Sequence, residues 1–262
     1  MNKDEGSVRV KTEQSIFEII IDRPAKLNGF TPKMFREMVG AYNRYEKEDA
    51  FRCAVVTAEG DHFTAGLDLP SMASHLSDDY ILTNAGEIDL FGMRPPFRTK
   101  PVICAVKGIC YTLGVELMLA ADVVVSAWDA RFAQLEVKRG IMPAGGATAR
   151  MVARAGWGNA MRYLLSGDEF GAKTAEKFGF VQEVVDPERV RARAFEIATS
   201  ICANAPLAVR ATITNSRAAI ISGEVDAFSE IGSLQRSLLD SEDVKEGIES
   251  FKSKRQANFS GK

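Results

Sequence analysis

Two glutamates in apolar surroundings are the residues of this chain best suited to proton transfer. Glu116 is the only acidic residue of the apolar stretch 108–121, which contains a predicted helix, and its helical neighbours three and four positions away are a threonine and three apolar residues. Burial of a carboxyl group raises its pKa towards neutrality. Glu136 lies in the similarly apolar stretch 132–137. Two such carboxyl groups facing one site would form an acid/base pair.

Each acid also has a structural interpretation, because ion pairs perturb carboxylates as well. Glu116 could reach a sheet edge or pair with an arginine. Glu136 could pair with Lys138, Arg139 or Arg131. The catalytic interpretation gains weight only in combination with two turns that can present backbone amides.

The first turn is 63–69 (FTAGLDL), whose small residues allow close backbone approach and leave amide N–H groups pointing outward. Taken alone, it could be a simple tight turn into a helix. The second turn, 112–114, is predicted to start the helix that carries Glu116, where free amides and the helix dipole favour an oxyanion. Amides from both turns, meeting over a thioester oxygen, would form an oxyanion hole.

Three other features favour a structural or pocket-lining role. The pair Gly145 and Gly146 lacks the spacing of a phosphate-binding loop, so we expect its loop to line a pocket wall. The basic run 252–255 is typical of a solvated helix face, with contact to a phosphorylated ligand as the alternative. His62 is expected to support its turn, and the cysteines and histidines show no spacing of a zinc site.

The surrounding pattern predicts an α/β architecture. Strands are predicted at 16–21, 54–57, 102–106, 122–126 and 181–185. A helix is predicted at 32–48, with Thr31 as its N-cap, and strands separated by helices favour parallel pairing. Segment 70–99 is interpreted as a helix followed by a mobile, substrate-facing loop.

After residue 140 the sequence is mostly helical. Helices are predicted at 189–204, from Pro206 onward and at 241–258. We therefore divide the chain into an α/β core, 1–195, and a helical C-terminal region, 196–262, with the transition inside 187–204.

Composition excludes several classes of protein. The chain has 262 residues, 46% of them hydrophobic, and a net charge of −2, so nothing favours binding to nucleic acid or to an anionic membrane. No signal peptide or spanning helix is predicted. The four scattered cysteines are typical of reduced core thiols, which together with the missing signal predicts a cytoplasmic protein.

Six motifs in order resemble the crotonase (enoyl-CoA hydratase/isomerase) superfamily, from about Val8 to Phe259. They lie at 22–28, 63–69, 106–117, 141–150, 165–185 and 246–255. The resemblance assigns the two oxyanion-hole amides to Ala65 and Leu113, and the two catalytic carboxyl groups of the hydratases to Glu116 and Glu136.

The resemblance also implies contacts to the substrate, with CoA arriving as part of it and no metal or redox cofactor needed. The implied CoA or substrate contacts are Ala25, Lys26, Leu27, Ala65, Gly66, Leu67, Asp68, Gly114, Phe251 and Lys254. Phe251 and Lys254 match positions that commonly contact CoA from a neighbouring subunit. The implied fold is a spiral of ββα units with a helical C-terminal trimerisation region, in a homotrimer or homohexamer.

The implied reaction is hydration of a 2-enoyl-CoA thioester. One departure bears on it, because Thr112 and Leu113 stand where hydratases usually carry glycines, and Tyr111 replaces a smaller aliphatic residue. The isobutyl group of Leu113 is expected to narrow the acyl pocket or tilt the loop. An enoyl-CoA isomerase, another acyl-CoA lyase or hydrolase of the superfamily, and a catalytically silent acyl-CoA binder remain alternatives.

Overall fold

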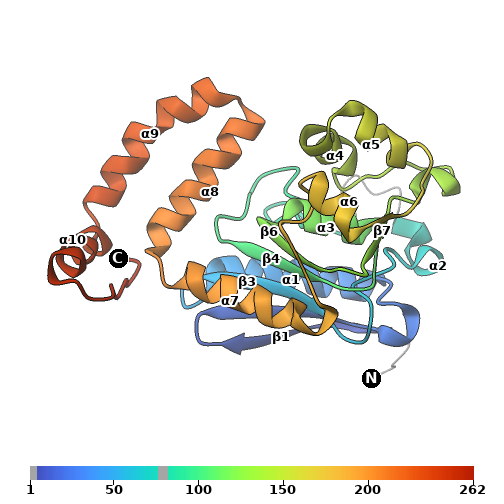
Figure 1. Ribbon diagram of the computed structural model, residues 1–262, viewed down its shortest axis with the longest axis horizontal. Helices are drawn as coiled ribbons and strands as arrows, with labels where there is room; N and C mark the ends of the chain where they lie inside the picture. Colours follow the sequence, from blue (N-terminus) through green and yellow to red (C-terminus); the bar gives the residue numbers. More distant parts are fainter. Residues whose placement is uncertain (1–4, 76–81) are drawn as a thin grey trace.

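The computed structural model describes residues 5–75 and 82–262, which form a sheet-based core and a projecting set of helices (Figure 1). The main sheet has the strand order β1-β2-β3-β4-β6-β9. Its strands are β1 (Ser7–Glu13), β2 (Ile16–Asp22), β3 (Cys53–Ala58), β4 (Val102–Val106), β6 (Val123–Ala127) and β9 (Glu183–Val185). All neighbouring strands pair in parallel except the β1–β2 hairpin, so the predicted parallel α/β core is confirmed.

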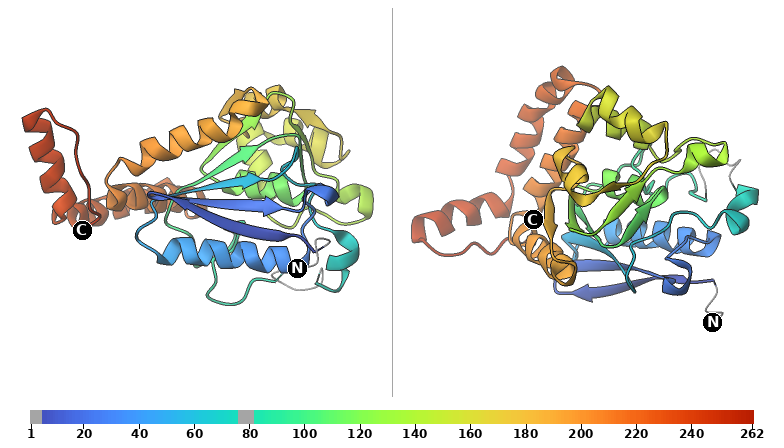
Figure 2. Two further views of the ribbon diagram at one scale, coloured as in Figure 1. Left: turned by 90° about the horizontal axis from the view of Figure 1, so that it is seen from below. Right: turned by 45° about the vertical axis from the view of Figure 1, so that its right-hand side comes forward.

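Helices cover both faces of this sheet, which explains why its central strands are almost wholly apolar (Figure 2). Helix α1 (Pro32–Lys47) lies on one face, and α7 (Val190–Cys202) lies on the other. The predicted N-cap is confirmed, because the Thr31 hydroxyl accepts the N–H of Met34 at 3.3 Å.

A second, smaller sheet with the order β5-β7-β8 completes the core. It consists of β5 (Ile109–Tyr111), β7 (Arg131–Ala133) and β8 (Phe170–Gly171). Two successive ββα units result: β4, β5 and α3 (Leu113–Ala120), then β6, β7 and the 3₁₀ turn η3 (Glu136–Arg139). The helix predicted to begin at 112–114 is confirmed as α3, whereas residues 109–111 of the same stretch form β5 and pair with β7, a strand pairing that was not predicted.

The two units place the acids at equivalent positions. Strands β5 and β7 pair in parallel, with Tyr111 opposite Ala133. The chain segments that follow them, one leading to Glu116 and the other to Glu136, therefore leave the small sheet side by side. This pairing is what brings the two carboxyl groups to one region.

Shorter elements connect these units. They are η1 (Pro24–Lys26), α2 (Leu69–Met72), η2 (Ala73–His75), α4 (Ala147–Ala155), α5 (Trp157–Leu164), α6 (Ala172–Lys177) and η4 (Pro187–Arg189). Of the predicted helix and loop at 70–99, only the short α2 and η2 are helical among the described residues, and 76–81 lie outside them.

The C-terminal helices extend away from the core (Figure 1). Helices α8 (Pro206–Ile221) and α9 (Glu224–Leu239) pair with each other, and α10 (Glu242–Ser253) follows at the far end. Helix α7 continues through residue 195, and the projecting helices begin at Pro206. The boundary between 1–195 and 196–262 stays a prediction.

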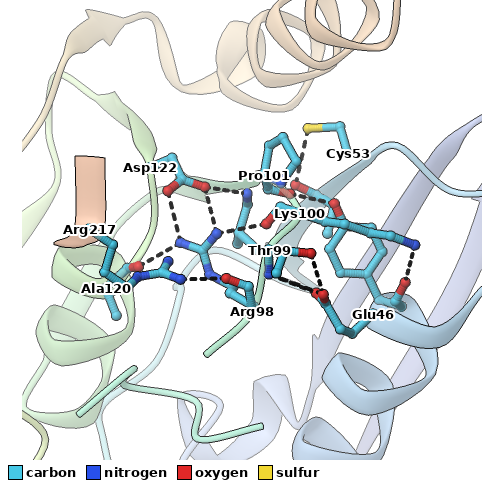
Figure 3. A network of polar contacts seen from close by, with 12 residues as sticks. Glu46, Cys53, Arg98, Thr99, Lys100, Pro101, Ala120, Asp122 and Arg217 are labelled. Atoms are coloured by element: carbon cyan, nitrogen blue, oxygen red, sulfur yellow. Dashed lines mark hydrogen bonds and ion pairs between the residues drawn. The ribbon is translucent and has the colours of Figure 1, made fainter. Parts of the chain in front are cut away.

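A buried polar network attaches α8 to the core (Figure 3). Arg98 is buried and forms a two-pronged pair with Asp122, at 2.7 and 3.0 Å. Arg217 of α8 donates to the carbonyl oxygen of Arg98, and Thr99 contacts Glu46 of α1. The network therefore ties α8, α1 and the start of β6 to one connecting segment. Across the described ranges, no helix is both long and apolar enough to cross a membrane.

Candidate active site

Both acidic residues line one cavity of about 390 Å³. The same cavity is lined by Ala65, Leu67 and Leu113 from the two turns. The structure thus brings together the two carboxyl groups and the two amide-bearing turns that sequence analysis selected separately.

Glu116 is held in place by backbone amides rather than by a cation. Its side chain lies on α3 and is 5% exposed. Its Oε1 accepts the N–H of Gly145 at 2.6 Å and that of Ala147 at 3.3 Å. Burial raises the pKa of Glu116 to about 7, against the opposing effect of these amides, and the nearby Glu136 raises it further.

Glu136 is the first residue of η3 and is 9% exposed. Burial raises its pKa to about 6, with its own backbone amide acting in the opposite direction. With its amide nitrogen turned towards Glu136, Gln134 donates to both carboxylate oxygens at 3.2 Å and to the Thr112 carbonyl at 3.3 Å. Gln134 is 1% exposed, so sequence analysis missed a buried polar contact of the site.

The ion-pair alternatives for Glu136 do not occur. Lys138 pairs with Asp168, and Arg131 lies 3.7 Å from Glu169. Arg139 donates to the Lys138 carbonyl oxygen. Among the described residues, neither Glu116 nor Glu136 has a cationic partner within ion-pair distance, so both acids are buried without charge neutralisation.

The amide donor assigned to Ala65 is wrong. The N–H of Ala65 donates to the Leu27 carbonyl at 2.9 Å, and that of Gly66 donates to the Thr64 hydroxyl at 3.0 Å. In contrast, the N–H groups of Leu67 and Leu113 donate to no acceptor in the described part of the chain. Both residues line the cavity, so the available amide pair is Leu67 and Leu113.

An unusual backbone conformation presents the Leu113 amide. Thr112 has φ +49° and ψ −113°, a combination that costs a residue with a side chain about 1–3 kcal/mol. It is fixed by its N–H, which donates to the Ala133 carbonyl at 2.8 Å, and by its carbonyl, which accepts the N–H of Glu116 at 3.1 Å. A Cβ on Gly66 would lie 1.7 Å from the Thr112 hydroxyl, so the close approach of the two turns requires glycine at 66.

The departures from the family pattern have distinct outcomes. The isobutyl group of Leu113 is buried and lines the cavity, and its predicted narrowing of the acyl pocket stays a prediction. Tyr111 does not line the cavity; its hydroxyl donates to Glu169 at 2.5 Å. The supporting role predicted for His62 is confirmed, because its Nδ1 accepts the N–H of Ile109 at 3.2 Å.

The predicted CoA contacts fall into groups. Only Ala65 and Leu67 line the cavity, whereas Ala25, Lys26 and Leu27 form the neighbouring turn at η1. Asp68 pairs with Arg23 at 2.7 Å and so ties the 63–69 turn to the η1 turn.

The remaining predicted contacts lie outside the cavity lining. Gly66 packs against Thr112, and Gly114 packs against Thr64, at positions where a side chain would not fit. Phe251, which is 85% exposed, and Lys254 lie at the end of α10 on the projecting helices, so their contact with CoA of a neighbouring subunit stays a prediction. Within the described ranges, no cluster of His, Cys, Asp and Glu could hold a metal ion.

Comparison with known proteins assigns the family. The sequence model of the enoyl-CoA hydratase/isomerase family matches residues 11–262, and the chain belongs to this family, the crotonase superfamily. The structure is similar to that of a probable enoyl-CoA hydratase/isomerase from Mycobacterium abscessus, with a TM-score of 0.94 at 41% identity over 98% of this chain and 99% of that one.

Two curated relatives carry different activities. The chain is 32% identical over 246 residues to enoyl-CoA hydratase EchA19 of Mycobacterium tuberculosis, covering 92% of this chain and 91% of the relative. It is 28% identical over 265 residues to the mitochondrial Delta(3,5)-Delta(2,4)-dienoyl-CoA isomerase of Dictyostelium discoideum, covering 96% and 90%. The chain is therefore an enzyme of the hydratase/isomerase family with the crotonase fold.

Proposed function

We propose that the enzyme adds water across the double bond of 2-enoyl-CoA thioesters. The observation that carries this proposal is the placement of two carboxyl groups with raised pKa values, Glu116 and Glu136, in the cavity that also receives two open amides. Hydration needs both a base for water and an acid for the α-carbon, together with stabilisation of an enolate.

The amides of Leu67 and Leu113 bind the thioester oxygen. Each donates a hydrogen bond that strengthens as negative charge develops on this oxygen in the enolate. Loss of one such donor typically lowers the rate by about 10²–10³. The strained backbone conformation of Thr112 orients the N–H of the next residue, Leu113, so this donor is in place before substrate binds.

The two carboxyl groups divide the proton transfers. Glu116, oriented by the amides of Gly145 and Ala147, takes a proton from water as the water oxygen bonds to the β-carbon. The electron pair of the double bond moves to the α-carbon, where Glu136 supplies a proton. With pKa values of about 7 for Glu116 and about 6 for Glu136, the singly protonated pair carries its proton mostly on Glu116. The form that reacts, with Glu116 ionised and Glu136 protonated, is then a minority of about one in ten, most populated between the two pKa values.

We further propose that CoA enters only as part of the substrate, with no metal or redox cofactor, and that the enzyme is a homotrimer or homohexamer. Exposed apolar residues along the projecting helices support the assembly. They are Ile220, Ile221, Val225, Phe228, Ile231 and Leu239. Burying such a surface between subunits is favourable, and a monomer rarely exposes one of this kind.

A double-bond isomerase is the second candidate. Leu113, in place of the usual glycine, narrows the cavity, which disfavours a bound water. The same acids could then move a proton between two carbons of the substrate without water. The 28% identical dienoyl-CoA isomerase shows that a relative has such an activity.

Spectroscopy with crotonyl-CoA and longer 2-enoyl-CoAs tests the proposal, because hydration removes the absorbance of the conjugated thioester. Glu116→Gln and Glu136→Gln should each lower the rate by about 10²–10⁴ while saturated acyl-CoA still binds. Glu176→Gln, on the exposed side of α6, is the matched control and should keep the rate.

Two results would overturn the hydratase assignment. Formation of the conjugated chromophore from a 3-enoyl-CoA, without hydration of any 2-enoyl-CoA, favours the isomerase. Binding of saturated acyl-CoA without turnover of either substrate class favours a silent binder. A Glu136→Gln protein with an unchanged hydration rate would eliminate the role given to Glu136.

A further inference from the structure

One guanidinium group lines the candidate acyl cavity without an acidic partner. Arg139 is the last residue of η3 and contributes to the cavity wall together with Ile141 and Met142. Its hydrogen bond goes to the neighbouring carbonyl of Lys138, at 3.2 Å. Within the described residues Arg139 forms no ion pair, whereas Lys138, one position earlier, lies 3.8 Å from Asp168.

The acidic groups of the cavity do not compensate this charge. The oxygens of Asp89 accept the N–H groups of Phe91 at 3.0 Å and Met93 at 2.9 Å, so they are already engaged. A second guanidinium, that of Arg94, lines the same cavity and donates to the Thr83 carbonyl at 2.9 Å. Arg139 thus adds a positive charge to the cavity wall, besides the two acids of the candidate site.

Arg139 lies three residues after Glu136 in the 3₁₀ turn η3 and lines the same cavity, yet its side-chain hydrogen bond goes to the Lys138 carbonyl and not to either acid. Its guanidinium is therefore available to a group of the ligand. The rest of the wall near it, Leu135, Ile141 and Met142, is apolar and suits an aliphatic spacer.

We propose that Arg139 binds a carboxylate at the far end of the acyl chain, so that the preferred acyl groups are those of dicarboxylic acids. A guanidinium can hold a carboxylate by two parallel charge-assisted hydrogen bonds. Arg139 is exposed, as are the neighbouring Ile141 (44%) and Met142 (65%), so this contact is partly solvated. The proposal rests on the proposed function only in placing the acyl group in this cavity.

Calorimetric binding tests the proposal without requiring turnover. Hexanoyl- and octanoyl-CoA are compared with adipoyl- and suberoyl-CoA, which have the same chain lengths and one additional carboxylate. The unmodified protein should bind at least one dicarboxylic thioester about three- to fivefold more tightly, the upper range expected of a partly solvated charge pair. This preference should weaken as salt is added.

Three variants assign the preference to Arg139. Arg139→Leu should remove it and leave the affinity for hexanoyl- and octanoyl-CoA unchanged, whereas Arg139→Lys should keep most of it. Lys138→Leu is the matched control. It removes one positive charge from the residue next to Arg139, and Lys138 does not line the cavity, so this variant should keep the full preference for dicarboxylic thioesters.

Two results would overturn the proposal. In one, the unmodified protein binds each dicarboxylic thioester no more tightly than its monocarboxylic counterpart. In the other, Arg139→Leu weakens both classes equally, which places Arg139 on the CoA moiety. A failure of the hydratase proposal appears instead as absent turnover with the binding preference intact, so the two failures are distinguishable.

Discussion

Replacement of Glu116 by glutamine should stabilise the folded protein, and more so at pH 8 than at pH 5. Burial raises the pKa of Glu116 from 4.5 to about 7. The folded state therefore holds this proton more tightly than the unfolded state does. The contribution of this bound proton to the stability of the folded state is fully present below pH 4.5 and is lost as the pH rises through about 7. Glutamine carries no charge to desolvate, and its oxygen can still accept the N–H groups of Gly145 and Ala147.

The magnitude follows from the two pKa values. At about 1.36 kcal/mol per pH unit, the difference between 4.5 and about 7 costs about 3 kcal/mol of unfolding free energy at pH 8 and about 0.8 kcal/mol at pH 5. The substitution should thus gain roughly 2.5 kcal/mol more at the higher pH. For a chain of this size, this corresponds to a melting temperature raised by about 5–10 °C more at pH 8 than at pH 5.

Thermal unfolding of both proteins at one protein concentration, at pH 5 and pH 8, measures the effect. Glu176→Gln is the control, because Glu176 is exposed on α6. An equal change at both pH values would refute the reasoning, as would a Glu116→Gln protein that is less stable at pH 8. Either result would mean that the carboxylate of Glu116 is not desolvated in the folded state. The expected gain would show that the site sacrifices stability for proton transfer.

Three further predictions concern the same site. The hydration rate at low substrate should rise through about pH 6 and fall above about pH 7, because one carboxyl group must be ionised and the other protonated. A hydration rate that does not change between pH 5 and pH 9 would contradict this. Gln134→Leu should lower kcat about tenfold and move the acidic limb of that profile to higher pH, because the ionised form of Glu136 loses its donors. Thr112→Gly should raise the unfolding free energy by about 1 kcal/mol, since glycine tolerates the positive φ; urea unfolding should show the gain in this variant and not in Thr112→Ala.

Local sequence pattern was sufficient to find the acids and turns of the candidate site. Glu116 stands out because one acid in an apolar helical stretch is expensive to bury, and the small residues of 63–69 indicate close backbone approach. The helix α1 and the long parallel strands were also predictable, since their apolar periodicity and the N-cap Thr31 are local signals.

The identity of the first amide donor was not predictable locally. Ala65 and Leu67 are two residues apart in the same turn, and both carry a backbone N–H. The difference arises because the Leu27 carbonyl, in a turn distant in sequence, occupies the Ala65 amide. Such a hydrogen bond depends on tertiary structure, so no property of the 63–69 segment reveals it.

The convergence of the two acids depends on the least predictable part of the fold. Strands β5 and β7 have three residues each, too few for an alternating pattern, and neither strand was predicted. Yet their pairing sets Thr112 beside Ala133 and lets Gln134 contact Thr112 as well as Glu136.

The spacing of the reacting groups is therefore built into backbone pairing rather than into flexible loops. The Thr112 N–H donates to Ala133, and the next residue along the chain, Leu113, presents its open amide to the cavity. One residue beyond Ala133, Gln134 orients Glu136. A single ladder of the small sheet thus positions an open amide just after one strand and an acid just after the other. This coupling explains why a strained Thr112 is tolerated: relaxing it would move the amide and the acid relative to each other.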